Sequence, residues 1–141
     1  MVTIRRLGPG DAAVVMAAAE LFDSPPLPDA TARFLAERGH HLLMAFDGET
    51  AVGFVSGVET THPDKGTELV LYELAVAPAA RGAGAGRALT EALAALGRER
   101  GCYGMWVLTD EDNAAARRTY AAAGGRETKR QVMVEWDLRT T

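Results

Sequence analysis

The order of apolar and polar residues predicts a series of short strands. Apolar residues in 41–46 and 51–60 come at the spacing of strands, and Asp47-Gly48 between them is the signal of a tight hairpin turn. The next run, 68–76, is apolar on both of its faces, which is typical of a strand in the middle of a sheet. The polar stretch 61–66 is expected to be the loop before this central strand.

Apolar residues recur at helical spacing in four other stretches. Two short helices are expected near the N-terminus, starting at Asp11 and Asp29. The proline-rich segment 24–28 separates them, because proline lacks the N–H that a helix interior needs. The Asp11 carboxylate is expected to accept from the free N–H groups of the first turn. A longer helix is expected at 88–100 and a last one at 114–123.

The C-terminal residues alternate strictly between apolar and polar side chains, which predicts a closing strand. The apolar side of this pattern consists of Val132, Val134, Trp136 and Leu138. With a first strand at 2–6 and a short buried one at 105–109, the predicted order is β-αα-βββ-α-β-α-ββ. This order predicts a mixed α/β (α+β) fold, and residues 1–141 are expected to form one domain because no linker or repeat interrupts them.

Composition and charge narrow the possible functions. The chain has 141 residues and a net charge of −4, which argues against a nucleic-acid partner and favours a cationic one. Its single cysteine, Cys102, excludes an internal disulfide framework. No apolar run reaches the roughly 18 residues of a membrane helix, and the first residues lack the apolar block of a signal peptide. We therefore expect a cytoplasmic protein without a membrane partner and, since its histidines are not at ligand spacing, without a metal.

The stretch with the clearest chemistry is Arg81-Gly82-Ala83-Gly84-Ala85-Gly86-Arg87, which lies between the central strand and the long helix. Glycine lets a backbone approach a ligand closely, and a helix N-terminus offers free N–H groups, so this stretch predicts an anion site, most naturally for phosphate. A Walker loop would need Gly-Lys-Ser/Thr where Gly86-Arg87-Ala88 stands. A dinucleotide-binding fingerprint would need a third glycine at the position of Leu89.

Three motifs in order resemble the GNAT superfamily of N-acetyltransferases. They are Glu73-Leu74-Ala75-Val76, Arg81-x-x-Gly84-x-Gly86 and Asn113-x-x-Ala116-x-x-x-Tyr120-x-x-x-Gly124. The resemblance implies a mixed, mostly antiparallel sheet that splays open around its central strands, with about four helices. It also implies acetyl-CoA as the donor. In Glu20-Leu21-Phe22, in 71–76 and in the acidic turn before Asn113 the chain looks closest to aminoglycoside 3-N-acetyltransferases.

The resemblance assigns the donor site residue by residue. The strand backbone is expected to pair with the pantetheine arm, and the glycine loop is expected to hold the pyrophosphate. Asn113 is predicted to cap the last helix first and to contact the cofactor in addition. The residues expected to bind acetyl-CoA are Leu74, Ala75, Val76, Arg81, Gly82, Ala83, Gly84, Ala85, Gly86, Arg87, Asn113, Ala116 and Tyr120.

Three residues are candidates for the proton transfers of the reaction. Because Tyr120 falls on the family's tyrosine position, the resemblance implies that it is the general acid for the departing sulfur. The alternative is a core residue, as most helical tyrosines are. Glu73 is predicted to lie on one strand face with Leu69, Leu71 and Ala75, and to be the general base or a contact of the substrate amine, the alternative being a surface carboxylate. Asp110 is the other candidate for base or substrate contact, and Glu111 and Asp112 are expected to form an acidic rim for a cationic substrate, the alternative being a solvated loop.

The sequence therefore predicts an acetyl-CoA-dependent N-acetyltransferase that acts in a ternary complex on a small cationic amine. The favoured acceptor is the 3-amino group of an aminoglycoside antibiotic, which would make the protein a resistance enzyme. Another small amine, or a protein or peptide amine, is the alternative acceptor, and an acyl-CoA-binding sensor is the non-enzyme alternative. Acceptor choice is expected to depend on 25–28, 61–66 and the acids around Asp110. A homodimer is possible, because the C-terminal strands alternate.

Overall fold

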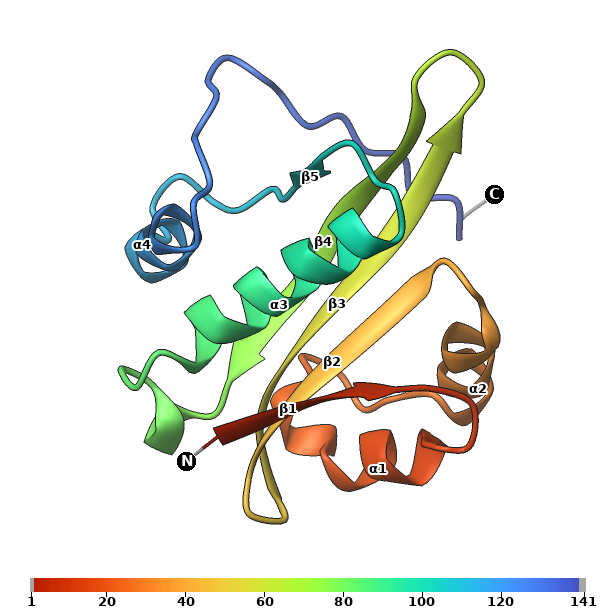
Figure 1. The fold of residues 1–141 in the computed structure, drawn as a ribbon, viewed down its shortest axis with the longest axis vertical. Coiled ribbons are helices and arrows are strands. Elements are labelled where there is room, and N and C mark those ends of the chain that lie inside the picture. Colours follow the sequence, from red (N-terminus) through yellow and green to blue (C-terminus); the bar gives the residue numbers. More distant parts are fainter. Residues whose placement is uncertain (1, 140–141) are drawn as a thin grey trace.

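The structure, a computed structural model, describes residues 2–139 and contains a five-stranded sheet in the order β1-β2-β3-β4-β5 (Figure 1). The first four strands are antiparallel, whereas β5 is parallel to β4. Their bounds are β1 Val2–Leu7, β2 His40–Asp47, β3 Thr50–His62, β4 Gly66–Val76 and β5 Met105–Trp106. This mixed, mostly antiparallel sheet is the predicted fold class.

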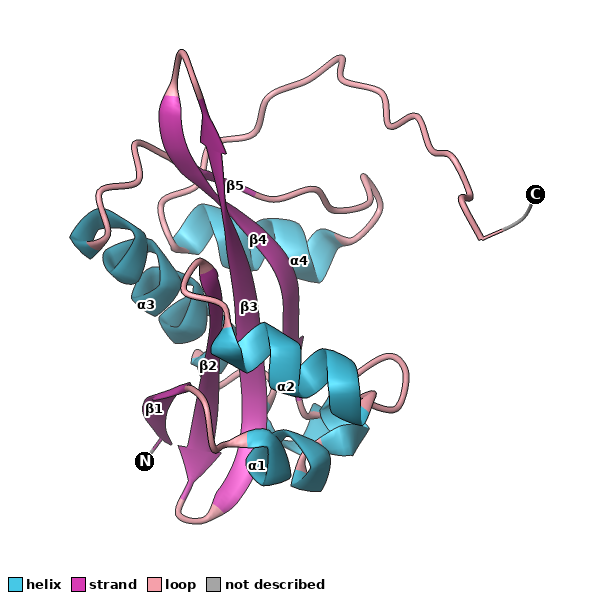
Figure 2. Ribbon diagram, turned by 90° about the vertical axis from the view of Figure 1, so that its right-hand side faces the viewer, coloured by secondary structure: helices cyan, strands magenta, loops and turns pink. Residues whose placement is uncertain are grey.

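Helices cover both faces of the sheet (Figures 1 and 2). Their bounds are α1 Ala12–Ala17, η1 Ala19–Leu21, α2 Pro28–Ala36, η2 Pro78–Ala80, α3 Ala85–Glu99 and α4 Ala114–Ala122, where η marks a 3-10 helix. The α3 helix lies across β2, β3 and β4, and α4 packs beside α3. On the other face, α2 packs on β2 and contacts α1. Among residues 2–139, no helix is both long and apolar enough to cross a membrane.

Strand β2 shows why two helical layers are needed. Its Leu43 and Ala45 are buried in the core under α3, which also contains Leu89 and Leu93 of that helix. Its Leu42 and Met44 are buried in the opposite core, under α1 and α2. A strand that buries both of its faces requires cover on both sides. Truncating a fully buried leucine such as Leu93 to alanine is expected to cost roughly 2–5 kcal/mol.

A bulge in β4 changes which side chains face the site. Ser56 of β3 pairs with Glu73, whereas the next residue, Gly57, pairs with Leu71, so Tyr72 is an extra residue in the strand. The predicted common face of Glu73 with Leu69 and Leu71 is therefore wrong. Both leucines are buried under α3, but the bulge turns Glu73 and Ala75 to the side of α1 and η1, where Ala75 packs against the second core.

Several predicted boundaries differ for local reasons. The Asp11 carboxylate accepts from the Gly8 N–H at 2.8 Å and not from the first turn of α1, so the predicted cap is wrong. The α2 helix begins at Pro28, the first helical position, where proline's missing N–H costs nothing. The predicted loop 61–66 is shorter in the structure, a turn at 63–65, because β3 and β4 stay paired out to His62 and Gly66.

The predicted C-terminal strands are not formed within the described residues. From Gly125 to Asp137 the chain forms neither helix nor strand. Its apolar side chains are exposed: 86% for Val132, 76% for Trp136 and 89% for Leu138. The alternation predicts a strand correctly only where a neighbouring strand supplies the ladder, and no part of residues 2–139 does so here.

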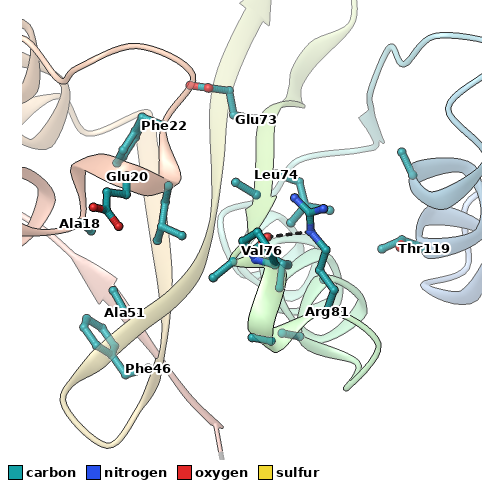
Figure 3. A pocket seen from close by; sticks show the side chains of 18 of the residues that line it. Ala18, Glu20, Phe22, Phe46, Ala51, Glu73, Leu74, Val76, Arg81 and Thr119 are labelled. Atoms are coloured by element: carbon teal, nitrogen blue, oxygen red, sulfur yellow. Dashed lines mark hydrogen bonds between the residues drawn. The ribbon is translucent and has the colours of Figure 1, made fainter.

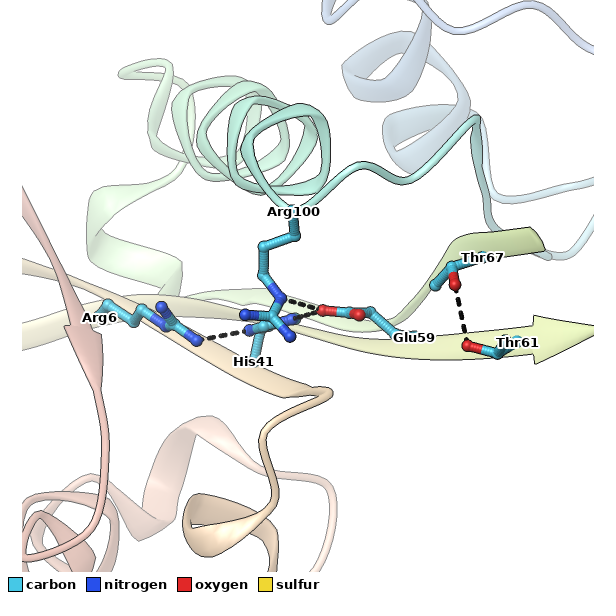
Figure 4. Close-up of polar contacts among 6 residues, drawn as sticks. All are labelled: Arg6, His41, Glu59, Thr61, Thr67 and Arg100. Atoms are coloured by element: carbon cyan, nitrogen blue, oxygen red, sulfur yellow. Dashed lines mark hydrogen bonds and ion pairs between the residues drawn. The ribbon is translucent and has the colours of Figure 1, made fainter.

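A polar cluster around the buried side chain of His41 ties the far end of the sheet to α3 (Figure 4). Arg6 donates to Nδ1 of His41 at 3.0 Å, so Nε2 carries the proton and donates to Glu59 at 2.6 Å. Arg100, which follows α3, forms an ion pair with the same Glu59 carboxylate. Burial, helped by the two arginines, lowers the pKa of His41, and hydrogen bonds from Arg100 and His41 lower the pKa of Glu59 against the effect of burial.

Candidate active site

The sheet opens between β4 and β5. Although β4 has 11 residues, it pairs with β5 only at Leu69–Met105 and Val70–Trp106. Beyond these pairs the strands diverge, and an open cleft of about 2060 Å³ lies beside the second half of β4. Its two sides are the loop side, formed by Val76, the glycine loop and α4, and the acid side, formed by η1, the residues after it and Glu73 (Figure 3).

The bulge also sets the direction of the β4 backbone. The N–H groups of Glu73 and Ala77 point toward β3, where they donate to Ser56 Oγ at 3.1 Å and to the Val52 carbonyl at 2.8 Å. Because backbone groups alternate along a strand, those of Leu74 and Val76 point the other way, into the cleft. The Val76 carbonyl there accepts from Arg81 Nε at 3.1 Å. Strand groups that face the cleft in this way fit an extended, amide-containing arm such as pantetheine.

The glycine loop has the geometry that an anion site needs. Gly82 and Gly84 have φ values of 84° and 88°, which side chains disfavour, and Gly84 is the N-cap of the 15-residue helix α3. Gly86 has a different role, because a Cβ there would lie 3.2 Å from Thr119 Cγ2 on α4. The loop thus presents the free N–H groups and positive dipole end of α3 to the cleft, which suits a pyrophosphate.

Most predicted donor residues line the cleft, and two do not. Those that line it are Leu74, Ala75, Val76, Arg81, Gly82, Gly84, Ala85, Gly86, Asn113, Ala116 and Tyr120. The two outside the lining are Ala83 and Arg87. The Arg87 side chain points away along α3 and pairs with Glu91 at 3.4 Å. Of the two flanking arginines, Arg81 is therefore the one placed to reach a bound anion.

Tyr120 projects from α4 at the cleft. Helix α4 begins at Ala114, and its N-cap is Asn113, whose Oδ1 accepts from the Ala116 N–H at 3.1 Å, so the predicted N-cap is confirmed. Tyr120 is half-buried and packs against the core under α3. Burial raises the pKa of its phenol, with no charged group contributing. The phenol therefore keeps its proton at neutral pH, as a proton donor must.

Glu73 occupies the acid side together with two carboxylates from the η1 segment. Burial raises the pKa of Glu73, and the negative charge of Asp23 raises it further. Glu20 and Asp23 line the same cleft, and Figure 3 shows the Glu73 side chain directed toward the segment that carries Phe22. The Phe22 ring is fixed by stacking on Phe54, with ring centroids 4.2 Å apart.

The predicted acidic rim is split by the structure. Asp110 is exposed and lies at the edge of the main cleft. Glu111 and Asp112 lie outside that cleft, in a shallow neighbouring hollow that they share with Asp110 and Arg117. The Glu111 carbonyl accepts from Arg117 at 2.8 Å. Asp110 is thus the only one of the three predicted loop acids that lines the main cleft.

Sequence reasoning missed Glu20 and Asp23 as site residues. Acceptor choice was expected to depend on 25–28 and 61–66, but no residue of either segment lines the cleft. The available signal was the position of Asp23, which ends the first helical segment just before the prolines. Only the packing of η1 against β3, with Phe22 on Phe54, brings these acids to Glu73.

Comparisons with known proteins agree with this geometry. A mycothiol acetyltransferase from Geodermatophilus obscurus is 37% identical over 97 residues, 66% of this chain; the match covers 30% of that protein, so this chain spans less than a third of the length of that curated relative. The crystal structure of an aminoglycoside acetyltransferase from an uncultured soil metagenomic sample is 25% identical, with a TM-score of 0.83 over 97% of this chain and 99% of that one.

The fold recurs at lower identity. The aminoglycoside N-acetyltransferase AAC(6')-Iy, in complex with the bisubstrate analogue CoA-S-monomethyl-acetylneamine, has a TM-score of 0.83 at 19% identity, over 97% of this chain and 99% of that one. The model of the acetyltransferase (GNAT) family matches residues 13–124. Acetyl-CoA is the donor of this family, as the motifs predicted. The chain belongs to the GNAT family of acetyltransferases.

Proposed function

We propose that this chain transfers the acetyl group of acetyl-CoA to a primary amine of a small polycationic acceptor, with an aminoglycoside as the favoured substrate. The proposal rests on one observation: a single cleft has anion-binding groups on its loop side and carboxylates on its acid side. The loop side offers backbone N–H groups and Arg81, which suit the phosphates of the donor. The acid side offers Glu20, Asp23 and Glu73, which suit an acceptor with several ammonium groups.

The donor would be held mainly by backbone groups. The N–H groups of the glycine loop and the start of α3 would bind the pyrophosphate, and Arg81 would add a charged contact. The cleft-facing backbone groups of Leu74 and Val76 would bind the pantetheine arm. One N–H of this strand would also stabilise the negative charge that develops on the reacting carbonyl oxygen. When bound, acetyl-CoA supplies an activated acetyl group, and the protein supplies position and proton transfer.

Glu73 is the proposed base. An acceptor amine is protonated near neutral pH and must lose a proton before its nitrogen can attack. Burial and the charge of Asp23 raise the pKa of Glu73, which brings a carboxylate closer to the basicity that this task needs. Its proton would pass to solvent through the open mouth of the cleft. Asp110, at the edge of the same cleft, is the alternative base.

Tyr120 is the proposed acid. As the carbon–sulfur bond breaks, the leaving sulfur needs a proton, and the phenol of Tyr120 is the group on the loop side that retains one. The attacking nitrogen loses its second proton as the amide forms, and this proton restores the Tyr120 phenol by way of solvent. The nitrogen then carries the acetyl group, and free coenzyme A departs. Both substrates are present together in this scheme, so no covalent acetyl-enzyme is formed.

The acceptor class is tested by a substrate panel with thiol release as the readout. The panel contains aminoglycosides with and without a free 3-amino group, linear polyamines, the amine acceptor of mycothiol acetyltransferases, and peptides with free amines. We expect turnover with aminoglycosides, and loss of turnover when the 3-amino group is blocked. Absence of thiol release with every aminoglycoside would exclude aminoglycosides as the acceptor. Equal turnover with and without a free 3-amino group would exclude only the 3-amino group as the acetylated position.

Thermal melting with acetyl-CoA tests the donor independently. Stabilisation should rise with donor concentration, as expected for a ligand that binds the folded state alone. No shift at millimolar donor would contradict donor binding. A shift without turnover on any amine would instead favour an acyl-CoA-binding module.

A further inference from the structure

Tyr72 is an exposed aromatic residue in the middle of a strand that is otherwise covered. All other residues of β4 from Thr67 to Val76 are buried or half-buried, whereas Tyr72 is exposed by 75%. Its side chain lines the same cleft as Glu73, the proposed base. Ligand sites typically combine aromatic surface with a few polar groups that fix orientation, and Tyr72 beside Glu73 is such a combination.

The bulge in β4 explains why this ring is exposed. Leu71 is buried under α3, so the alternation of a strand turns Tyr72 to the opposite face. The extra residue then leaves Glu73 on that face as well. The Glu73 N–H donates to Ser56 Oγ at 3.1 Å, which anchors the bulge to β3. Two consecutive side chains therefore reach one cleft, which a regular strand would not allow.

The ring of Tyr72 has no partner within residues 2–139. Its phenol forms no hydrogen bond there, and its ring takes part in no aromatic or cation–π contact. Tyr103 is also exposed, but its phenol donates to Glu68 at 3.1 Å, and Tyr120 packs against the core under α3. Strand β5 pairs with β4 only as far as Val70. Of the three tyrosines, Tyr72 is thus the one with a ring free to contact a ligand.

The surroundings of Tyr72 combine an apolar ring with negative charge. Glu20, Asp23 and Glu73 line the same cleft. Carboxylates attract any ammonium group, whereas the face of an aromatic ring takes up apolar C–H surface and attracts a cation above it. An amino sugar offers both partners, because its ring presents C–H surface and its amines are charged. A linear polyamine offers the charge without a ring.

We propose that Tyr72 determines acceptor specificity: its ring is the platform on which a sugar ring of the acceptor stacks, beside the amine that Glu73 contacts. This inference rests on the proposed function and narrows its acceptor from any small polycation to one that is built on rings. The platform belongs to a strand and not to a loop, so little order has to be gained when the acceptor binds. The carboxylates attract every polyamine, and Tyr72 supplies the preference for a ring.

The test compares two acceptors with the same number of amines: neamine, which is built on rings, and spermine, which is linear. Tyr72→Leu keeps an apolar side chain but removes the flat ring from an exposed position. The KM of neamine should rise at least ~10-fold with kcat within ~twofold, whereas the KM of spermine should rise less than ~threefold. Tyr72→Phe keeps the ring and should bring the KM of neamine back to within ~threefold of the wild-type value.

Further measurements separate stacking from a disturbed site. Tyr103→Leu, at a tyrosine that is 58% exposed and outside the cleft lining, is the matched control and should leave both KM values unchanged. In Tyr72→Leu the melting temperature and the affinity for acetyl-CoA should match the wild type, because only an exposed side chain changes. The acidic limb of the pH profile should also stay, since Glu73 is intact. Calorimetric titration of neamine in the presence of coenzyme A should show the same loss of affinity without turnover.

Two results would overturn this inference and leave the proposed function standing, because the wild-type chain would still acetylate neamine. An unchanged KM of neamine in Tyr72→Leu would exclude contact between this ring and the acceptor. An equal rise in the KM of neamine and of spermine would mean that Tyr72 shapes the cleft without recognising a ring. A wild-type chain that does not acetylate neamine would contradict the favoured acceptor of the proposed function, and the stacking inference would fall with it.

Discussion

The two sides of the cleft are built from different materials. The loop side is mainly backbone: Gly82 and Gly84 in left-handed conformations, the N-terminus of α3, and the cleft-facing groups of Leu74 and Val76. The acid side consists of side chains, Glu20 and Asp23 from the η1 segment and Glu73 from β4. The difference teaches that the donor site is set by the spacing of glycines along the sequence. Acceptor choice depends instead on how separate segments pack together.

The largest effect is expected from Tyr120, the proposed general acid, which lies on the loop side. Tyr120→Phe removes the phenolic proton and little else, so kcat should fall by at least ~100-fold while the affinity for acetyl-CoA stays within about twofold. Tyr103→Phe is the matched control, because that tyrosine is 58% exposed and bonds Glu68 away from the cleft. Steady-state kinetics and donor titration give both numbers. An unchanged kcat in Tyr120→Phe would exclude Tyr120 as the acid.

A second change tests the glycine loop. Gly84→Ala places a Cβ at φ 88° beside the start of α3, so the loop must shift, and we expect the dissociation constant of acetyl-CoA to rise about tenfold. Gly66→Ala imposes similar strain at φ 86° in the β3–β4 turn, far from the cleft. Calorimetric titration should separate the two. Equal donor affinity in both variants would mean that the loop does not bind the donor.

A third change tests whether the carboxylates of the acid side recognise the acceptor. Asp23→Asn removes one of three carboxylates, so the KM of a polycationic acceptor should rise about five- to tenfold, and that of a monoamine should change less. It also removes the charge that raises the pKa of Glu73, and the acidic limb of the pH profile should move to lower pH. Asp29→Asn on α2, outside the cleft lining, is the control. An equal KM change for both acceptors would contradict charge recognition.

The smallest expected effect concerns the cluster remote from both sides. The pKa values of His41 and Glu59 are lowered in the folded chain, so the unfolded chain takes up protons first as the pH falls. Stability should therefore decrease below pH ~6.5, through His41, and further below pH ~4.5, through Glu59. His41→Gln should remove ~2–5 °C of the melting-temperature loss between pH 7 and 5. Parallel curves for both proteins would contradict this assignment.

The sequence predicted the loop side well because its geometry leaves little choice. Gly82 and Gly84 adopt conformations that other residues avoid, and Asn113 caps α4 as its side chain predicts. The bulge at Tyr72 could not be predicted, since the pairing of Ser56 with Glu73 sets it. A single extra residue moves the Glu73 side chain to the other face of the sheet. The sequence-based prediction assumed strict alternation and therefore placed that carboxylate under α3, which is the wrong face.

The acid side and the tail share another cause of failure. Asp23 reaches Glu73 only through the packing of the η1 segment, which a local pattern does not contain. The alternation of 132–138 predicted a strand, but a strand needs a partner, and none lies within residues 2–139. Apolar patterns along the chain indicate which side chains are stabilised by burial. They do not specify which segment provides that burial.

The account depends most on Glu73 as the group that takes the proton from the acceptor amine. The direct measurement is the pH dependence of kcat/KM for the wild-type chain and for Glu73→Gln, with the best acceptor of the panel. We predict that the wild-type profile has an acidic limb above the ordinary glutamate pKa of about 4.5, as burial and Asp23 require. In Glu73→Gln we predict that this limb disappears and that kcat/KM falls by at least ~100-fold. An unchanged limb in Glu73→Gln would contradict the account and transfer the role to Asp110 or to solvent.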